Sequence, residues 1–344
     1  MVIEVKIDGK RPFLVDVPVR VNIWIRPQCQ RAQFEVLKKA SPSILILQSD
    51  GGRNEKEWDA IHQNRRLFDE EVDWNCHIYK LYEEKNLGLY TMGGKVHDFI
   101  WSHFDRCILL EDDQIPAISF FRYCAELLEK YKDDYRISRI CGTNSVGSWE
   151  EASSDYFFSK DGSTWGIATW KRVMEQRDKS YGYSKDPYIM KLFKKNEPPF
   201  IYKMIKGYGQ NNYYGGHVAG TEFWSFFNAA AYNQLQIIPR KNLISNIGYG
   251  EGSAHANGAV FKGSIPKCMF LPLYELNFPL KHPQYIIADD DYAKKIQRDL
   301  GQGHPFISFF RRVRYFIQLL LHGKFLYISK KVKEKMGKSA DVEQ

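Results

Sequence analysis

The sequence lacks the features of a membrane-spanning or secreted protein. No window reaches the roughly 18 consecutive apolar residues of a spanning helix, and the opening MVIEVKIDGKRPFLV carries charges where a signal peptide has an apolar core. The six cysteines show no C-x-x-C spacing, and Cys107 and Cys141 lie inside strand-like runs. We therefore expect a cytoplasmic protein with buried, reduced thiols rather than a disulfide framework or a zinc site.

Surplus positive charge is absent from most of the chain. The formal net charge is +8, and residues 304–338 hold nine Lys and Arg against one acid, Glu334, so the remaining residues sum to zero. The main body therefore has no overall positive charge, and it contains no recognised nucleic-acid module. We expect no nucleic-acid partner.

Strand-like and helix-like segments alternate through the first part of the chain. The predicted strands are 19–25, 43–48, 75–81, 106–110 and 137–141. One predicted helix ends near residue 40, and the other predicted helices span 55–68, 90–102 and 119–131. This alternation predicts an α/β fold with a mostly parallel central sheet flanked by helices. Such sheets bind ligands at the carboxyl ends of their strands.

Three adjacent acids, Glu111, Asp112 and Asp113, directly follow the apolar strand 106–110. They repel one another unless positive charge lies nearby. If the strand continues, Glu111 and Asp113 share one face and Asp112 points to the other. Mg²⁺ or Mn²⁺ suits this cluster, because such ions take one or two carboxylates together with diphosphate oxygens. The alternative, acids favoured before a helix, explains one or two acids but not three.

A second run of three acids, 289–291 in YIIADDD, precedes the helical pattern YAKKIQRDL. Acids are favoured in the first turn of a helix, so we interpret this run as a helix cap.

Several short motifs spread over about residues 19–290; they are ILLEDD (108–113), FFRYCAELLEKY (120–131), EKNLG (84–88), TWGIATWKR (164–172) and IIPRKNLISNIGYGEGSAH (237–255). Together they resemble the GT-A glycosyltransferases, in particular the bacterial group often labelled hemolysin-like and, distantly, N-acetylglucosaminyltransferase I. The resemblance implies a GT-A, Rossmann-like fold. It also implies a metal-dependent, inverting transfer of a sugar from a nucleotide-diphosphate donor, most often a UDP-sugar, to a glycan or lipid-linked glycan in surface polysaccharide biosynthesis.

The same resemblance divides the chain into three parts. Residues 1–142 correspond to the nucleotide-sugar-binding half, 143–300 to the acceptor-binding half of the same domain, and 301–344 to a basic amphipathic tail. After residue 141 the pattern loosens into short strands and glycine-rich loops.

The resemblance also implies roles for single residues around the acidic cluster. Asp113 corresponds to the direct ligand of Mn²⁺ or Mg²⁺, and His255 in EGSAH to a second ligand, although a loop histidine is more often only exposed. Asp112 corresponds to a ribose contact, and Glu111 to a contact of the donor sugar or a metal-bound water. Asp50 corresponds to a base or ribose contact; it could equally be a turn residue before two glycines.

Donor contacts are further implied at Lys95, Trp165 and Gly166. Relatives tend to have basic residues just after EKNLG, where this chain has Thr91 and Met92, so Lys95 is the available substitute for a phosphate contact. Trp165 and Gly166 match the wall of the sugar pocket. Both Trp165 and Trp170 could instead be core residues, which is the expectation for Trp170.

The catalytic base that the resemblance implies is Glu222 in GTEFWSFF, where relatives more often have Asp. Inverting transfer needs a carboxylate that accepts the proton of the attacking hydroxyl. Glu222 could instead be an ordinary acid of a helix N-terminus after Thr221. Asp186, before Pro187, is the reserve candidate.

The segment 305–321 places its apolar residues on one helical face and arginines elsewhere. Such a helix, followed by a basic run to residue 338, can bind an anionic membrane surface, which for this protein implies the cytoplasmic face of the inner membrane. It could instead pack on the domain's own core.

Two other functions compete with the transferase. A sugar-nucleotide pyrophosphorylase has strand-end carboxylates but needs a glycine-rich loop after its first strand, where IRPQCQR has no glycine. A non-enzymatic membrane-active or carbohydrate-binding protein would depend on the tail alone.

Overall fold

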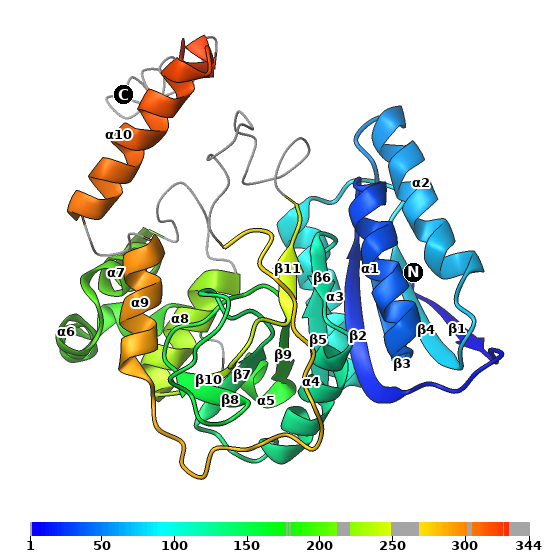
Figure 1. Cartoon of the computed structure of the whole chain (residues 1–344), viewed down its shortest axis with the longest axis horizontal. Coiled ribbons are helices and arrows are strands. Elements are labelled where there is room, and N and C mark those ends of the chain that lie inside the picture. The colour runs from blue at the N-terminus through cyan, green and yellow to red at the C-terminus, as the bar shows by residue number, and fades with distance from the viewer. Residues whose placement is uncertain are drawn as a thin grey trace.

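The computed structural model describes residues 2–176, 178, 180–211, 221–248, 268–300, 305–325 and 327–329. In these residues a nine-stranded sheet has the order β1-β4-β3-β2-β5-β9-β7-β10-β8 (Figure 1). Its strands are β1 (Ile3–Ile7), β2 (Val15–Ile23), β3 (Pro42–Ser49), β4 (Cys76–Tyr82), β5 (Arg106–Leu110), β7 (Ile137–Cys141), β8 (Tyr156–Ser159), β9 (Ile167–Trp170) and β10 (Leu235–Pro239).

Most strands of this sheet run in one direction. β4, β3, β2 and β5 are parallel neighbours. β9 is antiparallel to both β5 and β7, so β7 runs in the direction of β5, and β10 is parallel to β7. β1 and β8 pair antiparallel at the two edges. The predicted α/β fold with a mostly parallel central sheet is therefore confirmed.

Helices cover both faces of the sheet. The connecting helices are α1 (Pro27–Ala40), α2 (Glu55–Glu70), α3 (Leu89–His103) and α4 (Ser119–Lys130). Leu45 and Leu47 of β3 belong to the core under α1, α2 and α4, whereas Ile46 packs with α3 on the other face. Successive strand residues point to opposite faces, so a strand covered on both sides is apolar throughout, as ILIL (44–47) is.

The second half contains more helix than its glycine-rich sequence suggested. Short helices α5 (Lys171–Glu175) and η1 (Gly182–Lys185) precede α6 (Pro187–Asn196), α7 (Pro199–Asn211) and α8 (Thr221–Tyr232). The expected short strands are present as β8, β9 and β10, but these helices were not predicted. Phe193, Ile205, Phe223 and Phe227 form a separate apolar cluster among these helices, and its packing outweighs the low helix propensity of glycine.

The remaining elements complete the carboxyl edge of the sheet and the end of the chain. β6 (Gln114–Pro116) and β11 (Ile244–Asn246) form a two-stranded antiparallel ribbon. Helices α9 (Asp290–Leu300) and α10 (Pro305–Leu321) follow. Across the described ranges, no helix combines the length and the apolar character needed to cross a bilayer.

The buried thiols agree with the sequence-based expectation. Cys76, Cys107, Cys124 and Cys141 are buried and form no disulfide. Burial raises the pKa of the Cys107 thiol to about 12, so this side chain stays protonated and unreactive at neutral pH.

Candidate active site

The acidic cluster lies where the strand order of the sheet reverses. From β2 the chain builds outward through β3 and β4, and then returns to place β5 on the other side of β2. In open α/β sheets, ligands bind outside the carboxyl ends of the strands at such a reversal. Glu111–Asp113 follow the end of β5 there, and Arg26 follows the end of the neighbouring β2.

Arg26 supplies positive charge to two of the three acids. Its Nε and Nη2 donate to the two carboxylate oxygens of Asp112 at 2.9 and 2.7 Å. Its Nη1 lies 3.0 Å from Asp113 Oδ2. The side chains of Arg26 and Asp112 are only 17% and 5% exposed, so this is a mostly buried, bidentate ion pair.

Glu111 contacts a different pair of residues. Arg20 Nη2 donates to Glu111 Oε1 at 2.9 Å, and Asn22 Nδ2 donates to Oε2 at 3.0 Å. Arg20 and Asn22 are two residues apart on β2, so they point to the same face. Burial opposes ionisation of Glu111, but the charge and hydrogen bonds of Arg20, with the Asn22 hydrogen bond, outweigh it and lower the Glu111 pKa.

The predicted sharing of faces was therefore wrong. Strand alternation would have placed Glu111 and Asp113 together, but β5 ends at Leu110 and the chain turns at residues 112–113. The turn brings Asp112 and Asp113 to one guanidinium and leaves Glu111 against β2. The alternation rule fails because it holds only while the backbone stays extended.

Among the described residues, the charges at this turn have an excess of negative charge. Three carboxylates face two guanidinium groups, those of Arg20 and Arg26. Burial raises the pKa of Asp112 to about 6 despite its hydrogen bonds from Arg26. Burial, assisted by the charge of Glu111, also raises the pKa of Asp113. Burial is the main cause of both shifts, and repulsion between neighbouring carboxylates adds to it.

These residues fit a divalent cation by charge. The described part of the chain contains no cluster of three or more His, Cys, Asp or Glu side chains that could hold a metal ion. Mg²⁺ and Mn²⁺ do not require such a cluster when a diphosphate supplies oxygens, because one or two carboxylates then suffice. Asp113 is held less tightly than Asp112: Arg26 donates to both oxygens of Asp112, whereas the oxygens of Asp113 lie 3.0 Å from Arg26 Nη1 and 3.3 Å from Asn246 Nδ2.

Buried amide side chains hold the turn in place. Gln33 of α1 donates to the carbonyls of Glu111 and Gln114, each at 2.7 Å. Gln114 Oε1 in turn accepts the Glu111 N–H at 3.1 Å and the Gly166 N–H at 2.8 Å. The Gln114 side chain thus joins Gly166 to the acidic turn.

Residues at the end of β11, in the second half of the chain, contact the acidic turn. Ile247 N–H donates to the Asp113 carbonyl at 2.9 Å, and Asn246 Nδ2 lies 3.3 Å from Asp113 Oδ1. Arg26 Nη1 also donates to the Gly248 carbonyl at 3.2 Å. A Cβ at Gly248 would lie 2.0 Å from Asp113 Oδ2, so only glycine fits here.

Asp50 has a structural role at the neighbouring strand end. Its Oδ1 accepts the N–H groups of Gly51 and Leu87 at 2.9 and 2.8 Å, and its Oδ2 accepts that of Gly88 at 2.9 Å. The carboxylate therefore ties the end of β3 to the loop that precedes α3. A contact of Asp50 with a donor base or ribose stays a prediction.

We expect Asp50→Ala to lower the free energy of unfolding by about 2 to 3 kcal/mol, because three backbone donors lose their acceptor. Urea unfolding followed by circular dichroism measures this loss. Asp98→Ala is the matched control: its side chain is 78% exposed, so a change within about 0.5 kcal/mol is expected. Equal stability of the two variants would contradict the structural role of Asp50.

The other residues implied to contact the donor have neighbours that the structure describes. Lys95 forms an ion pair with Glu83. Gly166 has φ +59°, and a Cβ there would come within 2.5 Å of Ile244. Trp165 is half-buried against the main core. Trp170 is a core residue, as expected, and its Nε1 donates to the Leu128 carbonyl at 3.0 Å.

The implied base and second metal ligand are not described at the side-chain level. Glu222 lies in the first turn of α8, but its side chain is outside the described atoms. His255 falls outside the described residues. The reserve candidate Asp186 caps α6 by accepting the N–H groups of Tyr188 and Ile189 at 2.8 and 3.3 Å.

The second acid run forms a helix cap, as its sequence indicated. Asp289 precedes α9, and its Oδ1 accepts the Tyr292 N–H at 2.9 Å. Its Oδ2 accepts a hydrogen bond from Trp149 Nε1 at 2.7 Å.

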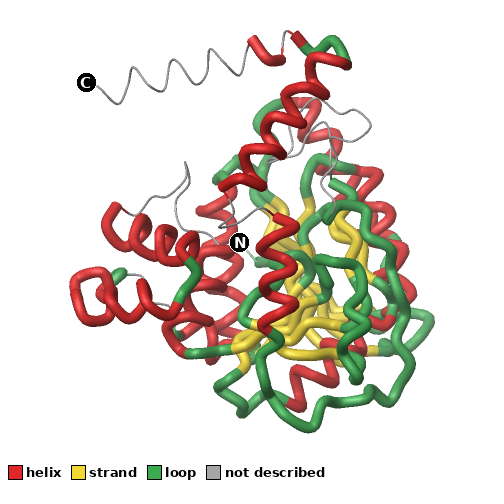
Figure 2. Tube along the Cα trace, turned by 60° about the vertical axis from the view of Figure 1, so that its left-hand side comes forward, coloured by secondary structure: helices red, strands yellow, loops and turns green. Residues whose placement is uncertain are grey.

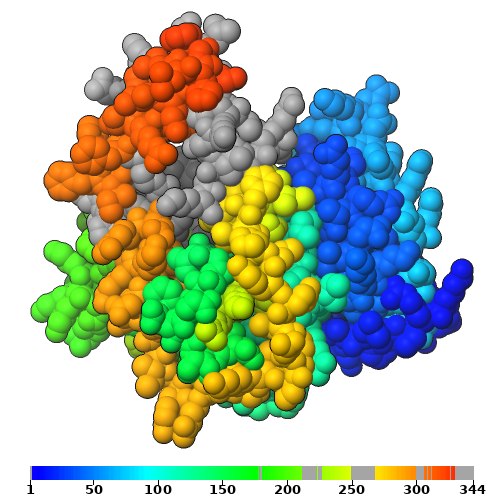
Figure 3. All heavy atoms as spheres, viewed as in Figure 1, coloured from blue at the N-terminus to red at the C-terminus, as the bar shows by residue number. Residues whose placement is uncertain are grey.

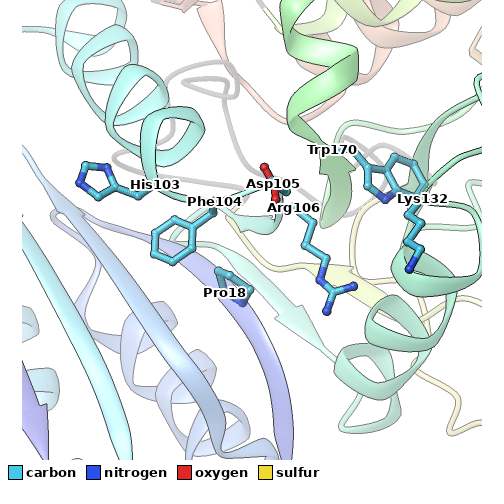
Figure 4. Close-up of a pocket in the computed structure, with 7 residues that line it drawn as sticks. All are labelled: Pro18, His103, Phe104, Asp105, Arg106, Lys132 and Trp170. Carbon is cyan, nitrogen blue, oxygen red and sulfur yellow. The ribbon is translucent and has the colours of Figure 1, made fainter.

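A cavity of about 350 Å³ lies away from the acidic turn. Figure 4 shows its lining residues, which are Pro18, His103, Phe104, Asp105, Arg106, Lys132 and Trp170. Arg106 begins β5, whereas the acids follow the other end of that strand. The cavity is therefore at the amino ends of the strands and has no contact with the candidate site.

The two arginines were not predicted from the sequence as partners of the acids. Arg20 and Arg26 are 91 and 86 residues from the acids that they bind. The sequence did place Arg26 just after a predicted strand, and therefore at the carboxyl edge of a parallel sheet. The sequence did not indicate which acid Arg26 binds, because that contact depends on the strand order, in which β5 lies beside β2.

Solved structures resemble this chain, whereas its sequence has no match among family models or curated proteins. Among solved structures, the apo form of mouse xyloside xylosyltransferase 1 aligns with a TM-score of 0.34 and 12% sequence identity. The alignment covers 64% of this chain and 84% of the mouse protein.

Proposed function

We propose that this protein is a glycosyltransferase that moves a sugar from a nucleotide-diphosphate donor, a UDP-sugar, to a glycan or lipid-linked glycan. The observation that carries the proposal is the acidic turn at the reversal of strand order, with three carboxylates against two guanidinium groups. A site of this kind has the position and the charge to hold a cation and, through it, a diphosphate.

The proposed donor site has Asp113 as the protein ligand of Mn²⁺ or Mg²⁺, with His255 as the second ligand. When bound, the ion stabilises the negative charge that develops on the leaving diphosphate. Arg26 holds Asp112 on both oxygens, so the turn is fixed before the donor arrives. The Glu111 side chain is 45% exposed and can accept a hydrogen bond from a hydroxyl group of the donor.

Inverting transfer then needs a base on the face of the sugar opposite the diphosphate. Glu222 is the proposed base, and α8 carries it from the second half of the chain. Trp165 and Gly166 are the proposed wall of the sugar pocket; Gly166 is held beside the acidic turn through Gln114. Surface polysaccharide biosynthesis in the cytoplasm is the proposed setting.

A panel of nucleotide sugars tests this function. The full chain is incubated with UDP-, GDP- and dTDP-sugars, with Mn²⁺, with Mg²⁺ and with a chelator, and release of the nucleoside diphosphate is measured. We expect release from one donor class, at a rate that falls when the chelator is present. If no donor is hydrolysed or bound under any of these conditions, the proposal is wrong.

A further inference from the structure

Helix α10 leaves its apolar face uncovered. Figures 1 and 2 show this helix projecting from the body beyond α9, and Figure 3 shows it at the surface. The side chains of Phe306, Phe309 and Phe310 are 78%, 60% and 66% exposed. Exposed aromatic side chains gathered on one helix are unusual on a soluble domain and mark an interaction surface.

The uncovered side chains form one stripe. At about 100° per residue, they occupy roughly one third of the helix circumference; the main members are Phe306, Phe309, Phe310, Phe316, Ile317 and Leu320. The less exposed residues of α10, Ile307, Tyr315 and Leu319, fall on the opposite side. The helix therefore does not use its apolar stripe to pack on the described part of the domain.

Arginines border the stripe on both sides. Arg312 and Arg314 are exposed, and helical geometry places one at each edge of the apolar stripe. Arginines in this position can reach up from an interface to phosphate groups while their stems cover apolar surface. The following sequence adds five lysines at 330, 331, 333, 335 and 338 against Glu334. Both features complement an anionic surface.

We propose that α10 binds the surface of an anionic lipid bilayer, with the helix axis in the plane of the interface. A helix of 17 residues is about 25 Å long, and it carries arginines along its sides, so it suits an interfacial position and not a crossing one. Six apolar side chains enter the boundary of the acyl region, and the arginines pair with lipid phosphates.

Membrane binding through α10 would involve a part of the molecule apart from the candidate site. In Figure 1, α10 lies at the upper left, whereas β6 and β11, which adjoin the acidic turn, lie near the middle. The inference does not depend on the proposed transferase activity, because it rests on α10 and the basic sequence that follows it.

Vesicle co-sedimentation of the full chain tests the proposal. One set of vesicles is pure phosphatidylcholine, and the other contains about one-third phosphatidylglycerol. We expect binding to the anionic vesicles, weakened when salt is raised from about 0.1 to about 1 M because the Debye length falls from about 10 to about 3 Å. Absence of binding to the anionic vesicles would overturn the proposal.

Substitutions in α10 test whether this helix makes the membrane contact. Arg312→Gln with Arg314→Gln should weaken partitioning about 30-fold, since each cation near the surface contributes about a factor of five. Phe309→Ser with Phe310→Ser should weaken it at least about tenfold. Phe13→Ser is the matched control, because Phe13 is also exposed, at 46%, but lies far along the chain near β2.

Two further results decide against the proposal. If the α10 variants bind as well as the parent chain, the contact lies elsewhere. If the parent chain sediments as a dimer in the ultracentrifuge and the double Phe→Ser variant as a monomer, the stripe is covered by a second copy of the chain. Thermal unfolding should be unchanged in every variant, because all the substituted side chains are exposed.

Discussion

Arg26→Met should lower the free energy of unfolding by about 3 to 5 kcal/mol, because it leaves two mostly buried carboxylates without their guanidinium. Urea unfolding at neutral pH measures the loss. Mn²⁺ should then stabilise the variant more than the parent chain, since a cation that binds only the folded state replaces part of the missing charge.

The matched control for this experiment is Arg31→Met. Arg31 also binds a carboxylate on two nitrogens, that of Glu71 at 2.7 Å, but its side chain is 46% exposed. Surface ion pairs contribute about 0 to 1 kcal/mol, so this variant should be nearly as stable as the parent chain. If both variants lost the same small amount, Arg26 would not be neutralising the acidic turn.

Asp113→Asn should reduce metal-dependent release of nucleoside diphosphate at least about a thousandfold, because the ion loses its protein carboxylate. The variant should be at least as stable as the parent chain, since the cluster has one more negative than positive charge and loses repulsion. A steady-state assay with the responsive donor, together with thermal unfolding, measures both quantities.

Asp291→Asn provides the control from the second acid run. Its side chain is 83% exposed in the first turn of α9, so activity should not change. Full activity of Asp113→Asn would contradict the role proposed for the acidic turn. Loss of activity with loss of stability would mean that Asp113 acts only in folding.

Much of the first half of the fold could be predicted from the sequence. The predicted strands 106–110 and 137–141 have the bounds of β5 and β7, and the other predicted strands and helices of this half differ by a few residues. These segments were predictable because apolar periodicity is local. The edge strand β1 was missed, since it pairs with β4 some 70 residues away and is largely exposed.

The location of the site could be predicted from the sequence, but the contacts between its residues could not. A run of acids at the end of an apolar strand placed it correctly at the carboxyl edge. The partners of those acids required the strand order and the turn at 112–113, which no local pattern encodes. In the second half, the helices around Phe193 and Phe227 depend on tertiary packing, which outweighs the glycine content of the segment.

One nitrogen atom couples two distant parts of the chain. Arg26 Nη1 lies 3.0 Å from Asp113 Oδ2 and donates to the Gly248 carbonyl at 3.2 Å. A ligand that draws this guanidinium away from Asp113 would also remove a hydrogen bond from the main chain at Gly248. Binding at the acidic turn would therefore change the contacts of the backbone that follows β11.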